Sequence, residues 1–86
     1  MSESLLEFPC EFPLKILGRD EPAFREAALF VVEKHTGKLD DDAVRTSSST
    51  NGNFVSITVT ITATSQQQLD DIYRDLTAHE QVLVAL

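Results

Sequence analysis

Two histidines, His35 and His79, are the side chains in this sequence best suited to acid–base chemistry or metal binding. Both lie where a helix is predicted to end, and neither has a second His, Cys or carboxylate at ligand spacing on a shared helical face. An imidazole at a helix C-terminus is favoured by the helix dipole and bonds to carbonyl groups left free there. We therefore interpret both histidines as capping or packing residues, and we predict no metal site.

The other reactive side chains also lack the neighbours that a catalytic or cofactor site needs. Cys10 is the only cysteine, so it cannot form an internal disulfide, and no CxxC or Cys-His arrangement surrounds it. The run Asp40–Asp42 lacks the glycine and the distal glutamate of a calcium loop. The serines at 47–49 adjoin neither a Gly-rich phosphate loop nor a nucleophile-elbow pattern. We therefore predict that the protein is not an enzyme and needs no cofactor.

The charge of the chain argues against polyanionic partners. Its 86 residues include 14 acidic and 7 basic side chains, for a net charge of −7, and the basic residues are scattered. Nucleic-acid binding requires clustered Lys and Arg, so this field repels DNA, RNA and anionic membranes. Residues 1–12 carry neither the basic start of a signal peptide nor a long apolar stretch. We therefore expect a cytoplasmic protein with no nucleic-acid or membrane partner.

The chain length and the hydrophobic pattern predict one domain. A hydrophobic content of 42% is ordinary for a globular protein, and 86 residues can bury one core. Residues 12–18 alternate apolar and polar side chains and end at a glycine, which predicts a first strand. The prediction is therefore a single domain over 1–86, in which residues 1–11 form an N-terminal extension.

A helix is predicted over residues 21–36. Asp20 or Glu21 can cap its first amides, Pro22 suits its first turn, and Thr36-Gly37 is a stop signal. At 100° per residue one face gathers a stripe of mostly apolar residues. These are Phe24, Ala27, Ala28, Val31, Val32 and His35.

Two further strands are predicted to form a hairpin. Residues 43–49 have a weak strand pattern and lead into Asn51-Gly52, a dipeptide typical of type I′ hairpin turns because both residues tolerate positive φ. Residues 54–63 follow as a long strand rich in Val, Ile and Thr.

A second helix and a last strand complete the chain. Ser65 and Gln68 have the spacing of a capping box, and the apolar residues that follow recur with helical spacing, so a helix is predicted over 66–79. Residues 81–86 are short and β-prone, which predicts a fourth strand.

This order, βαββαβ, predicts an α+β ferredoxin-like sandwich, in which two helices cover one face of a four-stranded antiparallel sheet. The first and third strands are then central, and the second and fourth lie at the edges. A charge-free strand such as 54–63 is an aggregation hazard at an edge but not in the centre. Its apolar residues should face the helices. The uncovered face should carry Ser56, Thr58, Thr60 and Thr62, with Pro13, Lys15 and Leu17 beside them.

The uncovered face has two interpretations. It carries no aromatic platform on which RNA bases could stack. Threonine has a high β propensity, so a solvated face is one interpretation, and packing against a second subunit is the other. We favour water, because interface centres are richer in apolar and aromatic side chains. The expected state is a monomer or a weak homodimer.

Leu29 and Phe30 interrupt the polar face of the first predicted helix. An apolar pair in that position marks either stray surface residues or a docking site for a protein partner. Phe30 is the stronger candidate, because aromatic residues are over-represented among interface anchors.

The segment between the first strand and the first helix is a second candidate site, for a small ligand. A helix N-terminus attracts anions, and Arg19 can add a charge-assisted contact. The candidate ligand-binding residues are Gly18, Arg19, Asp20 and Pro22. A turn followed by a helix cap explains the same residues without a ligand.

Four stretches together resemble the YbeD-like family of small bacterial proteins, a domain of unknown function: LLEFPCEFPLKILG, VVEKH, NFVSITVTITATS and QLDDIYRDL. The resemblance implies a ferredoxin-like fold similar to ACT regulatory domains, which bind amino acids or similar small ligands. Asp20-Glu21-Pro22 resembles part of the ACT ligand loop, with Ala23 where ACT domains favour glycine. The expected function is a non-catalytic regulatory or protein-interaction module, and the alternative is a sensor of an amino acid or carboxylate metabolite.

Overall fold

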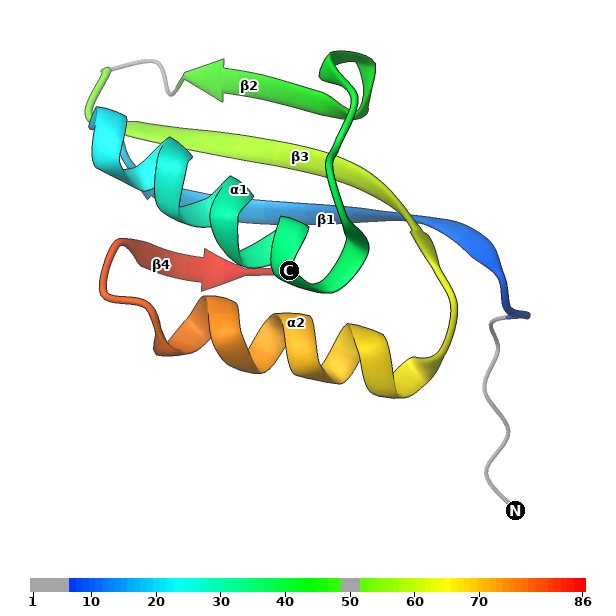
Figure 1. Ribbon diagram of the computed structural model, residues 1–86. Coiled ribbons are helices and arrows are strands. Elements are labelled where there is room, and N and C mark those ends of the chain that lie inside the picture. Colours follow the sequence, from blue (N-terminus) through cyan, green and yellow to red (C-terminus); the bar gives the residue numbers. More distant parts are fainter. Residues whose placement is uncertain (1–6, 49–51) are drawn as a thin grey trace.

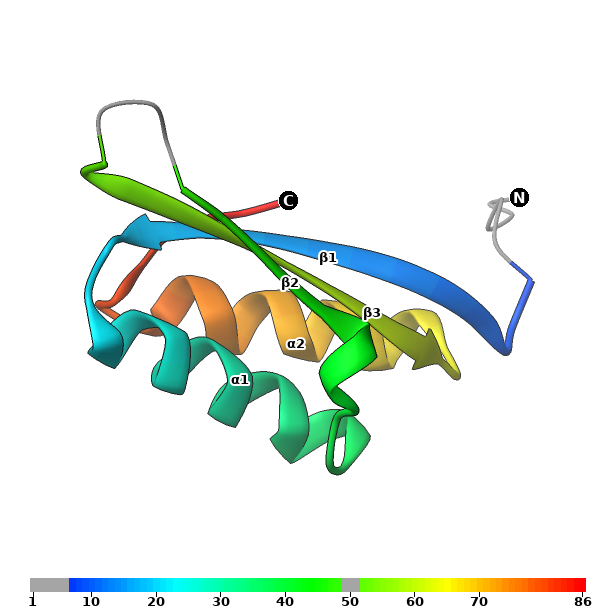
Figure 2. The same ribbon diagram turned by 90° about the horizontal axis from the view of Figure 1, so that it is seen from above.

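The computed structural model describes residues 7–48 and 52–86, and it has the predicted order of elements. The sheet is antiparallel with the strand order β2-β3-β1-β4, and both helices lie on one side of it (Figures 1 and 2). The α+β ferredoxin-like prediction is therefore confirmed. The elements are β1 (Cys10–Arg19), α1 (Pro22–Thr36), β2 (Val44–Ser48), β3 (Phe54–Ala63), α2 (Gln66–Ala78) and β4 (Val82–Ala85). A 3₁₀ turn, Asp41–Ala43, precedes β2.

The core lies between the sheet and the two helices. Alternate residues of β1 and β3 point to it, so that Leu14 opposite Val59 and Ile16 opposite Ile57 form fully buried cross-strand pairs. The helices close the core with the apolar stripes predicted from their spacing. Their buried residues are Phe24, Ala28, Val31 and Val32 in α1, and Leu69, Ile72 and Leu76 in α2.

β1 begins two residues earlier than the sequence predicts. Cys10 pairs with Ala63 and Glu11 pairs with Thr62, so the last two residues of the predicted 1–11 extension belong to the sheet. Phe8 also packs against the core, and the half-buried Cys10 is a free thiol. The alternation of inward and outward residues continues through Cys10 and Glu11, but prolines at 9 and 13, which lack an amide donor, made this stretch a weak strand signal in the sequence.

The two helices begin in different ways. Glu21 is the N-cap residue of α1, but its side chain makes no capping hydrogen bond within the described chain, so the predicted side-chain cap is wrong. The α2 prediction is confirmed, because Ser65 Oγ accepts a bond from the Gln68 amide at 3.1 Å. The Gln68 side chain reaches back to the residue before the N-cap, since its Oε1 accepts from the amide of Thr64 at 2.8 Å.

The hairpin between β2 and β3 has the register that a two-residue loop at Asn51-Gly52 requires. Ser48 lies opposite Val55, and Gly52 has a φ of 76°, in the left-handed region that favours glycine. Asn51 lies outside the described residues, so the predicted turn type stays a prediction.

Gly18 allows β1 and α1 to pack closely. It is buried, and a Cβ atom at this position would overlap the aromatic ring of Phe24, which is itself fully buried. The backbone of β1 therefore forms part of the surface against which the first turn of α1 packs.

Replacing Gly18 by alanine should lower the free energy of unfolding by about 1–3 kcal/mol, the usual cost of forcing an extra methyl group into a packed core. Urea unfolding with an unchanged m-value measures the loss. In a Phe24→Leu background the same change should cost less, because the smaller side chain leaves room for the methyl group. An equal cost in both backgrounds would show that the Phe24 ring is not the obstacle.

Candidate functional site

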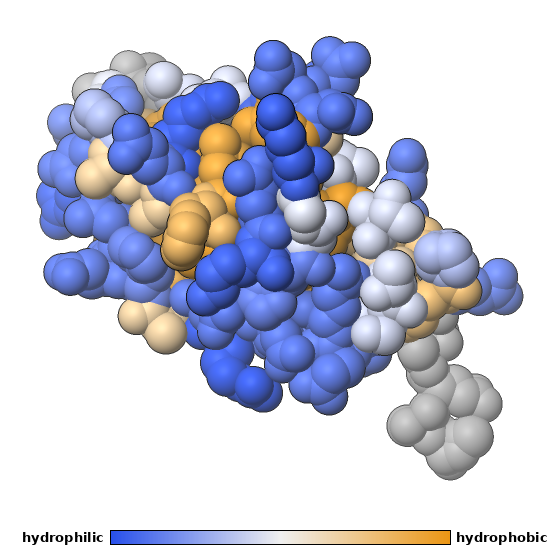
Figure 3. All heavy atoms as spheres, in the orientation of Figure 1, coloured by the Kyte–Doolittle hydropathy of each residue, from blue (hydrophilic) through white to orange (hydrophobic). Residues whose placement is uncertain are grey.

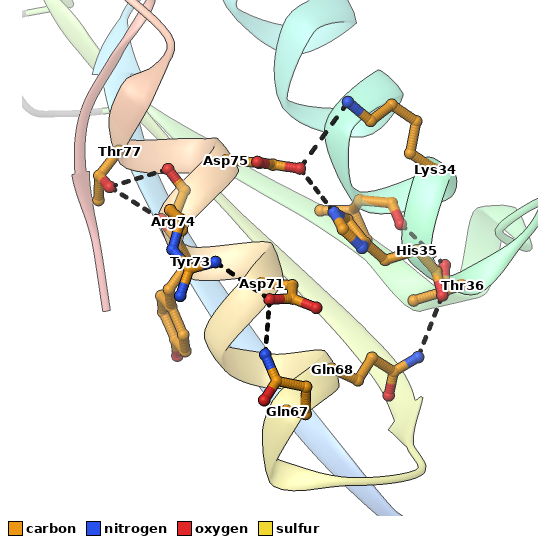
Figure 4. A network of polar contacts seen from close by, with 11 residues as sticks. Lys34, His35, Thr36, Gln67, Gln68, Asp71, Tyr73, Arg74, Asp75 and Thr77 are labelled. Carbon is orange, nitrogen blue, oxygen red and sulfur yellow. Dashed lines mark hydrogen bonds and ion pairs between the residues drawn. The ribbon is translucent and has the colours of Figure 1, made fainter.

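His35 at the end of α1 contacts a carboxylate that sequence spacing did not indicate. Its Nε2 lies 2.7 Å from Oδ2 of Asp75 on α2, and Lys34 Nζ lies 3.8 Å from the same oxygen (Figure 4). The carbonyl oxygen of His35 accepts a hydrogen bond from Gln68 Nε2 at 3.1 Å. Because His35 and Asp75 are 40 residues apart in the chain, only the packing of the two helices brings them together.

The His35–Asp75 pair joins the helices, and its surroundings offer little for catalysis. A catalytic pair needs a nucleophile or a substrate beside the imidazole. The charged side chain that adjoins this pair is instead Lys34, which contacts Asp75. Within residues 7–48 and 52–86 there is no group of three His, Cys, Asp or Glu side chains that could hold a metal ion. The hydrogen bond from His35 lowers the pKa of Asp75, partial desolvation opposes it, and the charge of Lys34 lowers it further.

His79 shapes the turn between α2 and β4. Its amide donates to the carbonyl oxygen of Leu76, and its own carbonyl accepts from the amide of Val82. Its Nδ1 accepts from the Gln81 amide at 3.2 Å. The His79 ring thus accepts from an amide beyond the helix and, within the described chain, does not make the predicted bond to a free helix carbonyl, and His35 binds a carboxylate of the neighbouring helix.

The loop that the sequence suggests as a ligand site, Gly18–Pro22, uses its backbone donors within the protein. The Asp20 amide donates to the carbonyl oxygen of Asn53 at 3.2 Å, and the Glu21 amide donates to that of Arg19 at 2.8 Å. Pro22 is the first residue of α1 and has no amide hydrogen. An anion at this helix N-terminus would have to compete for donors that the fold already uses.

A shallow hollow does lie beside this loop, where it meets the end of the hairpin. Arg19 is the basic residue of its lining, and Asp20 and Glu21 supply two carboxylates next to it. Two carboxylates beside one guanidinium give this hollow a net negative charge, which disfavours an anionic ligand. The full lining is Arg19, Asp20, Glu21, Gly52, Asn53 and Phe54.

The second predicted site, on α1, divides between core and surface. Leu29 is half-buried and packs against the core, so it does not belong to the exposed face as the helical wheel suggested. Phe30 is 64% exposed, and Lys34 Nζ lies 5.9 Å from the centre of its ring. Hydrophobic side chains reach the surface near α1 among hydrophilic neighbours (Figure 3).

Phe30 borders a shallow depression between α1 and the turn that follows α2. Ala23 and Ala27 are small, so they leave space on the α1 side, and Glu26 adds a carboxylate. We call this depression the Phe30 hollow. It is lined by Ala23, Glu26, Ala27, Phe30, His79 and Gln81.

The uncovered face of the sheet has the predicted composition. Thr60 and Thr62 are exposed, and Ser56 and Thr58 are half-buried. Register places Lys15 opposite Thr58, in the middle of this row. These four hydroxyl side chains, which we call the hydroxyl row, make the β3 part of the uncovered face polar.

These features define a small ferredoxin-like domain, in which exposed apolar side chains are more prominent than any cluster of reactive side chains in the described residues. The chain belongs to the family described as protein of unknown function DUF493, whose model matches residues 3–86. This finding confirms the resemblance to the YbeD-like family inferred from the sequence.

Curated relatives share this family and match along nearly their whole length. A UPF0250 protein from Paraburkholderia phytofirmans is 49% identical over 86 residues, which cover 100% of this chain and 97% of the relative. A UPF0250 protein from Nitrosomonas europaea is 42% identical and covers 98% and 97% of the two chains.

Among solved structures, protein HP0495 from H. pylori has a TM-score of 0.67 at 15% identity, covering 98% of this chain and 88% of that one. At this identity the similarity supports the fold alone. Within the described part of the chain, no helix is both long and apolar enough to cross a membrane.

The Asp75 contact predicts a pH dependence of stability. Because the pKa of Asp75 is below its ordinary value of 3.8 in the folded state, its ionised form stabilises the fold above that pH. The stabilisation is lost as the pH falls through the folded-state pKa. Urea unfolding at about pH 7 and about pH 3 should therefore show a larger destabilisation by Asp75→Asn at the higher pH.

Asp70→Asn is the matched control, because Asp70 lies on the same helix and accepts a hydrogen bond from Gln66 one turn away. It should change stability little at either pH. An Asp75→Asn effect that is the same at both pH values would contradict the assignment.

Proposed function

We propose that this domain is a non-catalytic protein-interaction module of the cytoplasm, and that the Phe30 hollow receives an apolar side chain from a basic segment of its partner. The exposure of Phe30 carries the proposal. An aromatic side chain that is 64% exposed contributes little to the core, and exposed aromatic residues beside small neighbours are typical interface anchors.

The shape of the hollow supports an inserted side chain. Phe30 forms one wall, and the alanines at 23 and 27 leave room on the same helix face. Burying an apolar group of the partner between them would remove the ring of Phe30 from water, at roughly 25 cal/mol per Å² of apolar surface covered.

The negative charge of the protein favours a basic segment around the apolar anchor of the partner. Glu26 lines the hollow, and the whole chain carries a net charge of −7. A partner segment with Lys or Arg around its apolar anchor would be steered toward this surface, and its binding would weaken as salt rises.

Quantitative mass spectrometry of proteins retained from a bacterial lysate tests the role of Phe30. We expect the retained amount of a basic partner to fall at least about 10-fold with Phe30→Ala, as for a strong interface anchor, and to fall with added salt. Leu86→Ala is the matched control, because Leu86 is also apolar and is 66% exposed. An equal loss of the partner with Phe30→Ala and Leu86→Ala, or no loss with either variant, would refute docking at this hollow.

Small-ligand sensing at Gly18–Pro22 is the second candidate function, and the hollow beside Arg19 is the observation in its favour. The used backbone donors and the two carboxylates of that hollow weigh against an anionic ligand. We therefore rank it below the interaction with a protein.

A thermal-shift screen separates the two functions. A ligand present at about 100 times its Kd would stabilise the fold by about 2.7 kcal/mol. With amino acids and common carboxylate metabolites we expect no rise in Tm. A rise that Arg19→Ala abolishes and Phe30→Ala leaves intact would establish sensing at the loop instead.

A further inference from the structure

β4 is an edge strand with an unusually apolar surface. Of the four large hydrophobic residues exposed in the described chain, three lie in or next to this short strand: Leu83 at 47%, Val84 at 40% and Leu86 at 66% exposure. Residues 81–86 carry no ionisable side chain and no proline. Natural edge strands usually carry such residues because they prevent pairing with other chains.

The backbone of β4 has groups directed away from the sheet. Lys15 and Leu86 exchange two hydrogen bonds, of 3.1 and 2.7 Å, so they form a hydrogen-bonded pair of the antiparallel ladder. Because such pairs alternate along a ladder, the amide and carbonyl of Ala85 point outward from β1. β4 is the outermost strand on that side of the described sheet (Figure 1).

The opposite edge of the sheet is protected. In β2, Arg45 and the three residues after it are exposed and hydrophilic. Arg25 on α1 donates from Nη1 to Thr46 Oγ1 at 3.0 Å, which adds a cation beside this strand. Charged side chains discourage edge pairing, so the two edges of the sheet differ in their capacity to accept another strand.

We propose that two copies of this chain associate by antiparallel pairing of their β4 strands, centred on Val84, to form one sheet across both copies. In this register Ala85 of each copy lies opposite Leu83 of the other, the residue that the shift in the β1–β4 register leaves without a partner in β1. The uncovered face of the sheet then has an apolar cluster where the two β4 strands meet. Each copy contributes Val84 and Leu17, which lie opposite each other in its own sheet.

A second copy fits this edge better than a foreign strand. Each copy has a net charge of −7, and β4 is a stretch where two copies can approach without bringing ionisable side chains together. A basic partner would gain no charge complementarity there. The symmetric pairing uses the β4 edge of both copies, and the protected β2 edges remain, so assembly stops at a dimer.

Sedimentation equilibrium of the purified chain at increasing concentration tests the proposal. We expect the average mass to rise from 9.5 kDa toward twice that value for the wild type and for Phe30→Ala. Ala85→Pro removes an outward amide and leaves the Lys15–Leu86 bonds intact, so this variant should stay at 9.5 kDa. Thr60→Lys is the control, because Thr60 lies on the uncovered face in β3, away from β4, and this variant should still dimerise.

Val84→Lys is a second disrupting variant, which would place two like charges side by side across the dimer axis. Circular dichroism and thermal unfolding establish that each variant is folded. A wild type that stays at 9.5 kDa throughout, or folded Ala85→Pro and Val84→Lys variants that dimerise as the wild type does, would overturn the proposal. Because no partner protein is present, this result is independent of docking at the Phe30 hollow.

Discussion

The pairing of β1 with β3 is the interaction on which the rest of the structure depends. Ten residues of each strand lie in register, and their alternation gives the sheet one apolar and one polar face. A slip of one residue would turn Leu14 and Ile16 away from the helices and expose Lys15 to them. The same register brings Gly18 under α1 and leaves β4 and β2 as the two edges.

Local periodicity was sufficient to predict most of the fold, because strands and helices of a small domain each have one buried face. The alternation in 54–63 and the helical spacing in 66–79 report that face directly. Contacts between distant elements are not encoded in such patterns. The His35–Asp75 bond and the burial of Leu29 depend on how α1 packs, and the early start of β1 at Cys10 depends on its pairing with β3.

The candidate sites differ in how far the fold accounts for their residues. The loop predicted to bind a ligand is explained by packing and hydrogen bonding within the domain, since Gly18 faces Phe24 and the amides of Asp20 and Glu21 are occupied. Phe30 has no comparable role in the fold, because most of its ring is exposed. A family of unknown function is thus best approached through the exposed apolar residues that its own core does not use.

Site-specific photo-crosslinking in living bacteria tests most directly whether the protein works through these exposed apolar surfaces. A photoreactive residue would replace Phe30, Val84, Thr58 or Asp70 in turn, so that two apolar surfaces are compared with the hydroxyl row and with the polar side of α2. The account predicts an adduct with another protein from position 30, an adduct with a second copy from position 84, and none from the two polar positions. Adducts from position 58 or 70, with positions 30 and 84 unreactive, would contradict it.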